Sequence, residues 1–362
     1  MITRPMIALG SVLLAAMFAC TFGCGGANEM PSTNTFVYVV QEQSSSTQPS
    51  LWTGSIAQLK VDGNGRLTSL QPSAVSASAV PASMAADPSG RYLLVSESGT
   101  VAEYSIAHDG TLTRRPPTGI VTGIHFTFTP DGRFLVATGV GPNGLPSNAL
   151  NICSFSSDGL LTLVSSANII SPDGPIVVDA SSKFVYFASL NDNRIYEYSL
   201  SAGGGLTPKG SVAAEGVSPF WLSFSPKGFL YSPINGAGGI LNEFRMNPND
   251  GTLAPGGSFV VCSQGEGPAT FTPSGMYAYV SCGGTVSQFS VDEVTGAFVP
   301  NGPDLDNVAT ITLDSSGKFA FALTDVDTVT RFTIGPNGTL SSDQAFVLST
   351  SMLGQSIVST HQ

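Results

Sequence analysis

One turn-and-strand unit recurs along the chain and restricts its fold more than any other feature of the sequence. A second turn, of the form Gly-x-Leu-Thr, alternates with it, and its seven copies begin 42 to 49 residues apart. A period in the forties with about four short strands per unit is typical of a β-propeller blade. The copies of the turn-and-strand unit are DPSGRYLLV (87–95), TPDGRFLVA (129–137), DASSKFVYF (179–187), SPKGFLYS (225–232), TPSGMYAYV (272–280) and DSSGKFAFA (314–322). The copies of the second turn begin at residues 65, 110, 159, 204, 251, 296 and 338.

The turn residues explain how each unit forms antiparallel hairpins. Asp/Ser-Pro-x-Gly places proline at the second turn position and glycine where the backbone needs a positive φ, which closes a tight hairpin. The Gly-x-Leu-Thr turn does the same between the outer strands. We name the four strands of a blade a to d from the axis outward.

The two ends of the repeat predict how the ring closes. The first unit begins at strand b, in TFVYVVQEQ (35–43), and lacks strand a, whereas GQSIVST (354–360) is left over after the last unit. We expect this segment to be the innermost strand of the first blade, which removes the open sheet edge. The predicted fold is all-β, a single seven-bladed propeller over residues 35–362.

The N-terminal segment predicts export. Residues 1–23 contain Arg4, an apolar run of about 14 residues and then small residues, the layout of a secretory signal. Cys24 is the preferred lipidation site and Cys20 the alternative, with residues 24–34 as a flexible tether. The expected location is the bacterial cell envelope, as a membrane-anchored lipoprotein that is periplasmic or on the cell surface. A plain cleaved signal is the other interpretation.

Charge and cysteine content exclude some classes of partner. The formal net charge is −11 and the 14 Lys and Arg residues are scattered, which argues against nucleic-acid binding. We expect a monomer. Export implies an oxidising compartment, in which Cys262 and Cys282 form a bridge or stay buried free thiols. Cys153 remains as an odd thiol.

Three segments of the third, fourth and fifth blades have a pattern beyond the general repeat: VTGIHFTFTPDGRF (121–134), SLNDNRIYEYSL (189–200) and SPFWLSFSPKG (218–228). They resemble the lactonase family of seven-bladed propellers, which includes propeller-type 6-phosphogluconolactonase and the fungal muconate cyclase. The resemblance covers about 35–360 and implies lactone hydrolysis at one end of the central channel. It implies that His125 and Arg194 occupy functional positions of the family.

Most of the family's other functional positions are replaced. A fourth-blade histidine becomes Ile176, a fifth-blade Arg-His pair becomes Phe220-Trp221, and a sixth-blade Ser-Asn-Arg becomes 281–283. The acidic residue of an Asn-Glu pair becomes Gly236, after Asn235. A phosphorylated substrate would need paired cations, and of the basic residues only Arg194 is expected at the mouth of the channel.

The ends of the b strands are expected to ring this mouth with polar and acidic groups. The sequence predicts a pocket for a small-molecule or protein ligand, walled by His125, Arg194 and Trp221, or else simply solvated polar loops. His125 is alternatively a hydrogen-bonded residue at a strand start, and Arg194 alternatively pairs with Asp192 or Glu197. No metal site or cofactor motif is predicted. The candidate ligand-binding residues are Trp221, Phe220, Asp192, Glu97, Asn235 and Asp325; Glu42, Cys282 and Asp327 also fall at the ring.

Three functions are compatible with these features. The first is an exported ligand- or partner-binding propeller with a degenerate catalytic site. The second is a hydrolase of a small unphosphorylated lactone, with His125 as base and Arg194 as electrophile. The third is a structural surface propeller. Phe220 and Trp221 favour binding by apolar and stacking contact, and strand alternation predicts that one faces the channel while the other packs between blades.

Overall fold

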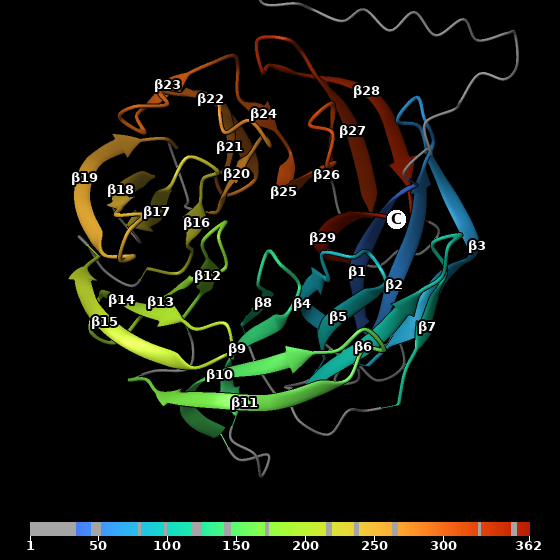
Figure 1. Cartoon of the computed structure of the whole chain (residues 1–362). Helices are drawn as coiled ribbons and strands as arrows, with labels where there is room; N and C mark the ends of the chain where they lie inside the picture. Colours follow the sequence, from blue (N-terminus) through green and yellow to red (C-terminus); the bar gives the residue numbers. More distant parts are fainter. Residues whose placement is uncertain are drawn as a thin grey trace, which may run out of the picture. The chain divides into compact units, whose positions relative to one another are not determined.

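Some of the repeated strands alternate polar and hydrophobic residues, and others are largely hydrophobic. They form antiparallel sheets because each strand pairs with the next one along the chain. In the computed structural model seven such sheets surround a central axis as the blades of a propeller (Figure 1). The structure describes residues 34–44, 52–78, 81–97, 100–116, 125–140, 146–170, 174–214, 219–234, 239–262, 267–324, 327–348 and 353–362. Among these residues, no helix has the length and hydrophobicity that crossing a bilayer requires.

Each blade contains the four predicted strands a to d, and the sixth carries a short additional strand. From the axis outward, blades 1 to 3 are β29 (Leu353–His361), β1 (Thr35–Ser44), β2 (Trp52–Val61), β3 (Leu67–Ala77); β4 (Pro81–Ala86), β5 (Tyr92–Glu97), β6 (Thr100–Ile106), β7 (Leu112–Arg114); and β8 (Phe126–Phe128), β9 (Phe134–Val140), β10 (Pro146–Phe155), β11 (Leu161–Asn168). Blades 4 and 5 are β12 (Ile176–Val178), β13 (Phe184–Ser189), β14 (Arg194–Leu200), β15 (Leu206–Ala213); and β16 (Ser223–Phe224), β17 (Phe229–Ile234), β18 (Ile240–Met246), β19 (Leu253–Val260). Blades 6 and 7 are β20 (Ala269–Phe271), β21 (Tyr277–Ser281), β22 (Thr285–Val291), β23 (Phe298–Pro300) with β24 (Leu305–Asp306) beside β22; and β25 (Val308–Leu313), β26 (Phe319–Thr324), β27 (Thr328–Ile334), β28 (Leu340–Val347).

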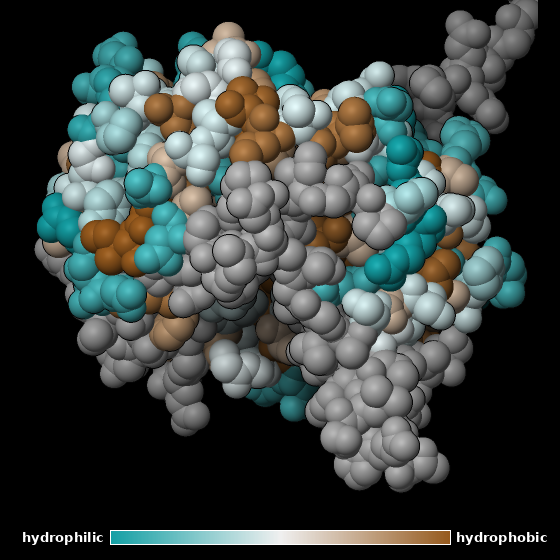
Figure 2. Space-filling view, turned by 90° about the horizontal axis from the view of Figure 1, so that it is seen from below, coloured by the Kyte–Doolittle hydropathy of each residue, from teal (hydrophilic) through white to brown (hydrophobic). Residues whose placement is uncertain are grey.

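Burial follows the position of a strand in its blade. The b strands β5 and β13 are buried at every position, because both of their faces pack against neighbouring blades. The outermost strand β11 alternates between inward and exposed residues. In the view of Figure 2 the described surface is mostly hydrophilic, and its hydrophobic residues form small separate patches.

The a–b turns have the predicted chemistry. Asp87 Oδ1 accepts the backbone N–H groups of Arg91 and Tyr92 at 2.8 and 2.6 Å, so the carboxylate caps the start of strand b. Gly90 has a φ of +70°, as the turn requires. In blade 4 the glycine is replaced by Ser182, which still adopts a φ of +58°.

Successive blades are joined by an aromatic ring that covers a glycine. The first aromatic residue of each b strand packs against the c–d turn glycine of the next blade, and this glycine has a positive φ in every blade. A methyl group on the glycine would lie 2.1 to 2.8 Å from a ring carbon, so no other residue fits without displacement. The seven pairs are Phe36–Gly110, Tyr92–Gly159, Phe134–Gly204, Phe184–Gly251, Phe229–Gly296, Tyr277–Gly338 and Phe319–Gly65.

Hydrogen bonds reinforce the same contacts. In four blades a buried b-strand tyrosine donates to the carbonyl of the same glycine, as Tyr38 does to Gly110 O at 2.7 Å. A c-strand side chain also caps the d strand of the following blade. Gln288 Oε1, for example, accepts the N–H of Leu340 at 2.7 Å.

The ring closes as the sequence predicted. β29 pairs with β1 as the innermost strand of blade 1, with Thr35 opposite His361, and Asn34 and Gln362 exchange two backbone hydrogen bonds of 3.1 and 2.9 Å. Phe319 of blade 7 covers Gly65 of blade 1, so the packing also continues across the junction.

Deleting residues 353–362 should therefore be strongly destabilising, because β1 becomes an open edge and the described part of the chain loses an inner strand. We expect the truncated protein to fail to fold or to melt more than about 10 °C lower, since several kcal/mol shift Tm by this much in a domain of this size. Calorimetry measures the effect, with deletion of residues 1–33 as a control that removes no described strand. A truncated protein that melts like the full-length one would contradict the closure.

One buried acidic side chain makes stability depend on pH. Glu103 is 4% exposed, lies between Arg115 and the Gly159 turn, and has its Oε1 atom 2.8 Å from Arg115 Nε. Burial outweighs the attraction of Arg115 and raises the pKa of Glu103 from its usual 4.5 to about 7. The folded state therefore keeps a proton that the unfolded state releases, and stability falls as the pH rises from about 4.5 to about 7.

Glu103→Gln should remove this loss of stability with rising pH, because glutamine is neutral at every pH. Relative to the unmodified protein, the variant should gain about 1–2 kcal/mol at pH 8 and much less at pH 4, as measured by urea unfolding. Glu293→Gln, which changes an exposed carboxylate, serves as the control. A Glu103→Gln effect of the same size at both pH values would show that burial does not control this group.

Candidate functional site

The mouth of the propeller is the end of the channel bordered by the b–c loops and by the d–a crossings between blades. The structure describes in full the b–c loops at 190–193 and 282–284 and the crossing at 301–307. The a–b and c–d turns lie on the opposite face. The candidate catalytic and ligand-binding residues that the structure describes belong to the mouth of blades 2 to 5.

The blade 4 hairpin carries Asp192 and its partner. Asp192 Oδ2 accepts a 2.6 Å hydrogen bond from the Tyr196 hydroxyl. The pKa of Tyr196 is raised to about 12, chiefly by burial and secondly by this hydrogen bond, so its hydroxyl stays protonated. Two buried oxygen atoms of the same hairpin, Ser189 Oγ and Asp192 Oδ1, have no hydrogen-bond partner among the described residues. Because both atoms are buried, they are unpaired acceptors inside the blade and do not lie on its open surface.

The side chain of Arg194 forms its hydrogen bonds within its own blade. Arg194 is the first residue of β14, and its Nε and Nη2 atoms donate to Ser211 Oγ and Ser211 O on the outermost strand at 2.8 and 2.9 Å. The ion pair with Asp192 or Glu197 that the sequence allowed is not formed in the described part of the chain. Two of its donors therefore point along the blade toward its rim.

His125 lies directly before β8, at the mouth end of the innermost strand of blade 3. Its carbonyl accepts the N–H of Thr138 at 2.9 Å, and its side chain is half-buried. β8 contacts β12 of blade 4, and β12 contacts β16 of blade 5. His125, Ile176 and Trp221 therefore belong to three consecutive inner strands or their entries.

The aromatic pair of blade 5 differs from its expected arrangement. Phe220 is 47% exposed and Trp221 is 43% exposed, so neither is packed between blades. The expectation from strand alternation was wrong because β16 contains only Ser223–Phe224, and the pair precedes it in irregular backbone. Two adjacent exposed aromatic side chains form an apolar surface at the entry to the inner strand.

Glu97 lies at the end of β5 and is fully buried. It forms a 2.7 Å ion pair with Arg114 of the outermost strand and accepts hydrogen bonds from Tyr104 Oη at 2.6 Å and Ser78 Oγ at 2.9 Å. The sequence did not link Arg114 to Glu97. We interpret this network as a structural one, because the charges of Glu97 and Arg114 neutralise each other.

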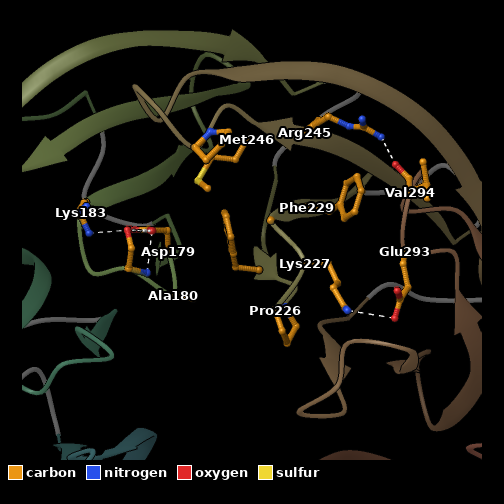
Figure 3. Close-up of a pocket in the computed structure, with 14 residues that line it drawn as sticks. Asp179, Ala180, Lys183, Pro226, Lys227, Phe229, Arg245, Met246, Glu293 and Val294 are labelled. Atoms are coloured by element: carbon orange, nitrogen blue, oxygen red, sulfur yellow. Dashed lines mark hydrogen bonds and ion pairs between the residues drawn. The ribbon is translucent and has the colours of Figure 1, made fainter. Parts of the chain in front are cut away.

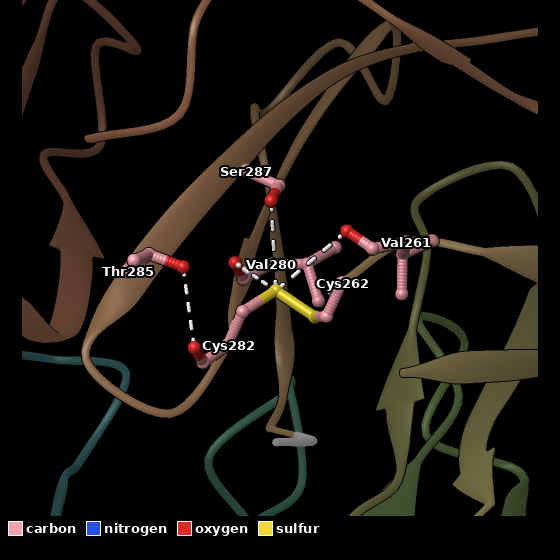
Figure 4. The surroundings of a disulfide bond; sticks show 6 residues. All are labelled: Val261, Cys262, Val280, Cys282, Thr285 and Ser287. Carbon is pink, nitrogen blue, oxygen red and sulfur yellow. Dashed lines mark hydrogen bonds between the residues drawn. A yellow bond between two sulfur atoms is a disulfide. The ribbon is translucent and has the colours of Figure 1, made fainter. Parts of the chain in front are cut away.

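Cys282 is joined to Cys262 by a disulfide bond (Figure 4). Both residues are buried, their Cα atoms are 5.5 Å apart, and Cys282 Sγ lies 3.6 Å from Ser287 Oγ. The bond ties the crossing after blade 5 to the b–c loop of blade 6. Closing a loop of 20 residues contributes about 3 kcal/mol in the chain-entropy account. Of the two possibilities left by the sequence, the bridge is the one formed, and Cys153 is a buried free thiol.

Four predicted positions lie outside the described residues: Asn235, Asp325, Cys20 and Cys24. Within the described part, no group of three or more His, Cys, Asp or Glu side chains is arranged to hold a metal ion. The described part of the mouth therefore presents an exposed aromatic pair and a half-buried histidine. Its two described cations, Arg114 and Arg194, are bound to other groups of the protein.

Comparison with protein families supports the resemblance inferred from the segments. Residues 29–145, about a third of the chain, match the family described as Lactonase, 7-bladed beta-propeller. No curated protein matches the chain. The resemblance to lactonase propellers is thus confirmed, and its match covers blades 1 and 2 and part of blade 3.

Solved structures show the same fold. A candidate 6-phosphogluconolactonase from Bacteroides fragilis superposes with a TM-score of 0.69 at 16% identity, covering 92% of this chain and 100% of its own. The periplasmic gluconolactonase PpgL of Pseudomonas aeruginosa gives a TM-score of 0.70 at 16% identity, with 90% and 99% covered. A candidate 6-phosphogluconolactonase from Bacteroides uniformis gives the same values. At this identity the likeness shows the fold and not the chemistry.

Proposed function

We propose that this lactonase-like propeller is an exported, lipid-anchored protein that binds a small neutral or cationic ligand at its mouth and has a degenerate catalytic site. The observation that carries the proposal is the exposed Phe220-Trp221 pair, which stands where the family resemblance places an Arg-His pair. Aromatic faces bind ring compounds by stacking and apolar contact.

The charges of the mouth favour a neutral or cationic ligand over an anion. Arg194 is bound to Ser211 and Arg114 to Glu97, so neither offers the free fork that holds a phosphate or carboxylate. The net charge of −11 repels anions in general. Export rests on the signal-like residues 1–23, and a gluconolactonase of the same fold is periplasmic.

A working lactone hydrolase is the second candidate. His125 supports it, because a histidine at the entry of an inner strand can act as a general base. The hydrogen bonds of Arg194 to Ser211 argue against a hydrolase, because they direct the proposed electrophile away from the mouth. An oxyanion formed from a lactone would then lack a positively charged partner among the described residues.

Trp221→Ala should weaken ligand binding at least about ten-fold, a loss of about 1.4 kcal/mol, because it removes the larger stacking surface. Isothermal titration calorimetry with γ-butyrolactone, δ-valerolactone and glucono-δ-lactone measures the effect. Val347→Ala, which truncates a side chain that is 64% exposed on β28, is the matched control and should bind as the unmodified protein does. Unchanged binding in Trp221→Ala would contradict the proposal.

The same three lactones separate binding from hydrolysis when acid release is followed in a pH-stat. The proposal predicts no release above the uncatalysed rate. Hydrolysis that disappears in both His125→Ala and Arg194→Ala would instead support the enzyme and overturn the degenerate site.

A further inference from the structure

The face opposite the mouth contains a hollow that no part of the proposed function uses. It has a volume of about 490 Å³ and lies among the a–b turns of blades 4 and 5 and the c–d turns of blades 5 and 6. Figure 3 shows Lys183 and Asp179 on one side and Phe229, Lys227 and Glu293 on the other. A volume of this size is within the range of small-molecule sites.

The hollow carries a small excess of positive charge on an acidic protein, because three cations and two carboxylates line it. Lys183, Lys227 and Arg245 line it, three of the 14 basic residues of a chain whose net charge is −11. Lys227 pairs with Glu293 at 3.1 Å. The other carboxylate, Asp179, is 1% exposed and already caps its turn by accepting the N–H groups of 183 and 184 at 2.8 and 2.7 Å.

Lys183 is the cation that remains available. In blades 2 and 3 the residue at the same turn position is an arginine, and each arginine reaches the c–d turn of the next blade. Arg91 Nη1 donates to Ser157 O and Arg133 Nη1 to Ala202 O, both at 3.0 Å. The Lys183 ammonium makes no such bond with any described residue, and its side chain is exposed.

Apolar side chains form the rest of the wall. Phe224 is half-buried and stacked on Tyr186, with ring centroids 5.7 Å apart, and Met246 is also half-buried. Val294 is 74% exposed. In Figure 3 Met246 is drawn between Lys183 and Arg245, and all three residues line the hollow.

We propose that this hollow binds a small organic carboxylate, with the anionic group at Lys183 and an apolar or aromatic body against Met246 and Phe224. A single lysine suits a singly charged carboxylate. A phosphate would favour a free arginine fork, and Arg245 is held by the carbonyl of Val294 and lies over the Phe229 ring at 5.2 Å.

The test uses the intact protein with methionine methyl groups labelled with ¹³C. The Met246 signal is identified by its absence in Met246→Leu. We expect benzoate to shift this signal saturably, whereas benzyl alcohol, of similar shape but neutral, and inorganic phosphate should each bind at least ten-fold more weakly.

Lys183→Met keeps the apolar stem and removes the charge, and it should weaken benzoate binding at least ten-fold. Lys318→Met is the matched control: Lys318 occupies the same position of the same kind of Asp-capped turn in blade 7 and does not line the hollow. The proposal is wrong if benzyl alcohol binds as well as benzoate, if phosphate binds more tightly, or if Lys183→Met binds benzoate like Lys318→Met.

Discussion

The ring depends on the contact between an aromatic side chain and the glycine of the next blade. Each glycine has a positive φ that closes the c–d turn, and each lacks the side chain that would displace the ring packed against it. One residue type thus serves both the hairpin within a blade and the junction between blades. Because the contact also joins blade 7 to blade 1, it acts together with β29 to close the ring.

These contacts lie toward the a–b and c–d turns, which has a consequence for the mouth. The junctions are held at one end of the blades, so the loops at the other end can vary without loss of the fold. The described mouth shows this freedom. A disulfide occupies the sixth-blade position where the family resemblance expects a polar triplet, and exposed aromatic residues occupy the fifth-blade position of an Arg-His pair.

The sequence predicted the fold well because its signals are local and repeated. Turn residues, strand patterns and the leftover segment 354–360 determine blade number, strand order and closure. The candidate site was harder, because a position at the mouth does not define a side-chain direction. Arg194 has the expected position but bonds to Ser211, and Glu97 is buried with Arg114, a partner that is distant from it in sequence. Strand alternation did not predict the orientation of Phe220 and Trp221, because β16 is only two residues long and does not include them.

The most direct test of this account compares two glycine substitutions by equilibrium unfolding. Gly110 has a φ of +88°, and a methyl group there would lie 2.2 Å from a ring carbon of Phe36. Gly284 has a φ of +104° but no atom within 4 Å of such a methyl group, so it reports the backbone cost alone. We expect Gly284→Ala to cost about 1–2 kcal/mol and Gly110→Ala to cost a further ~1–3 kcal/mol from overpacking. Equal losses in the two variants would show that the aromatic–glycine contact does not hold the blades together.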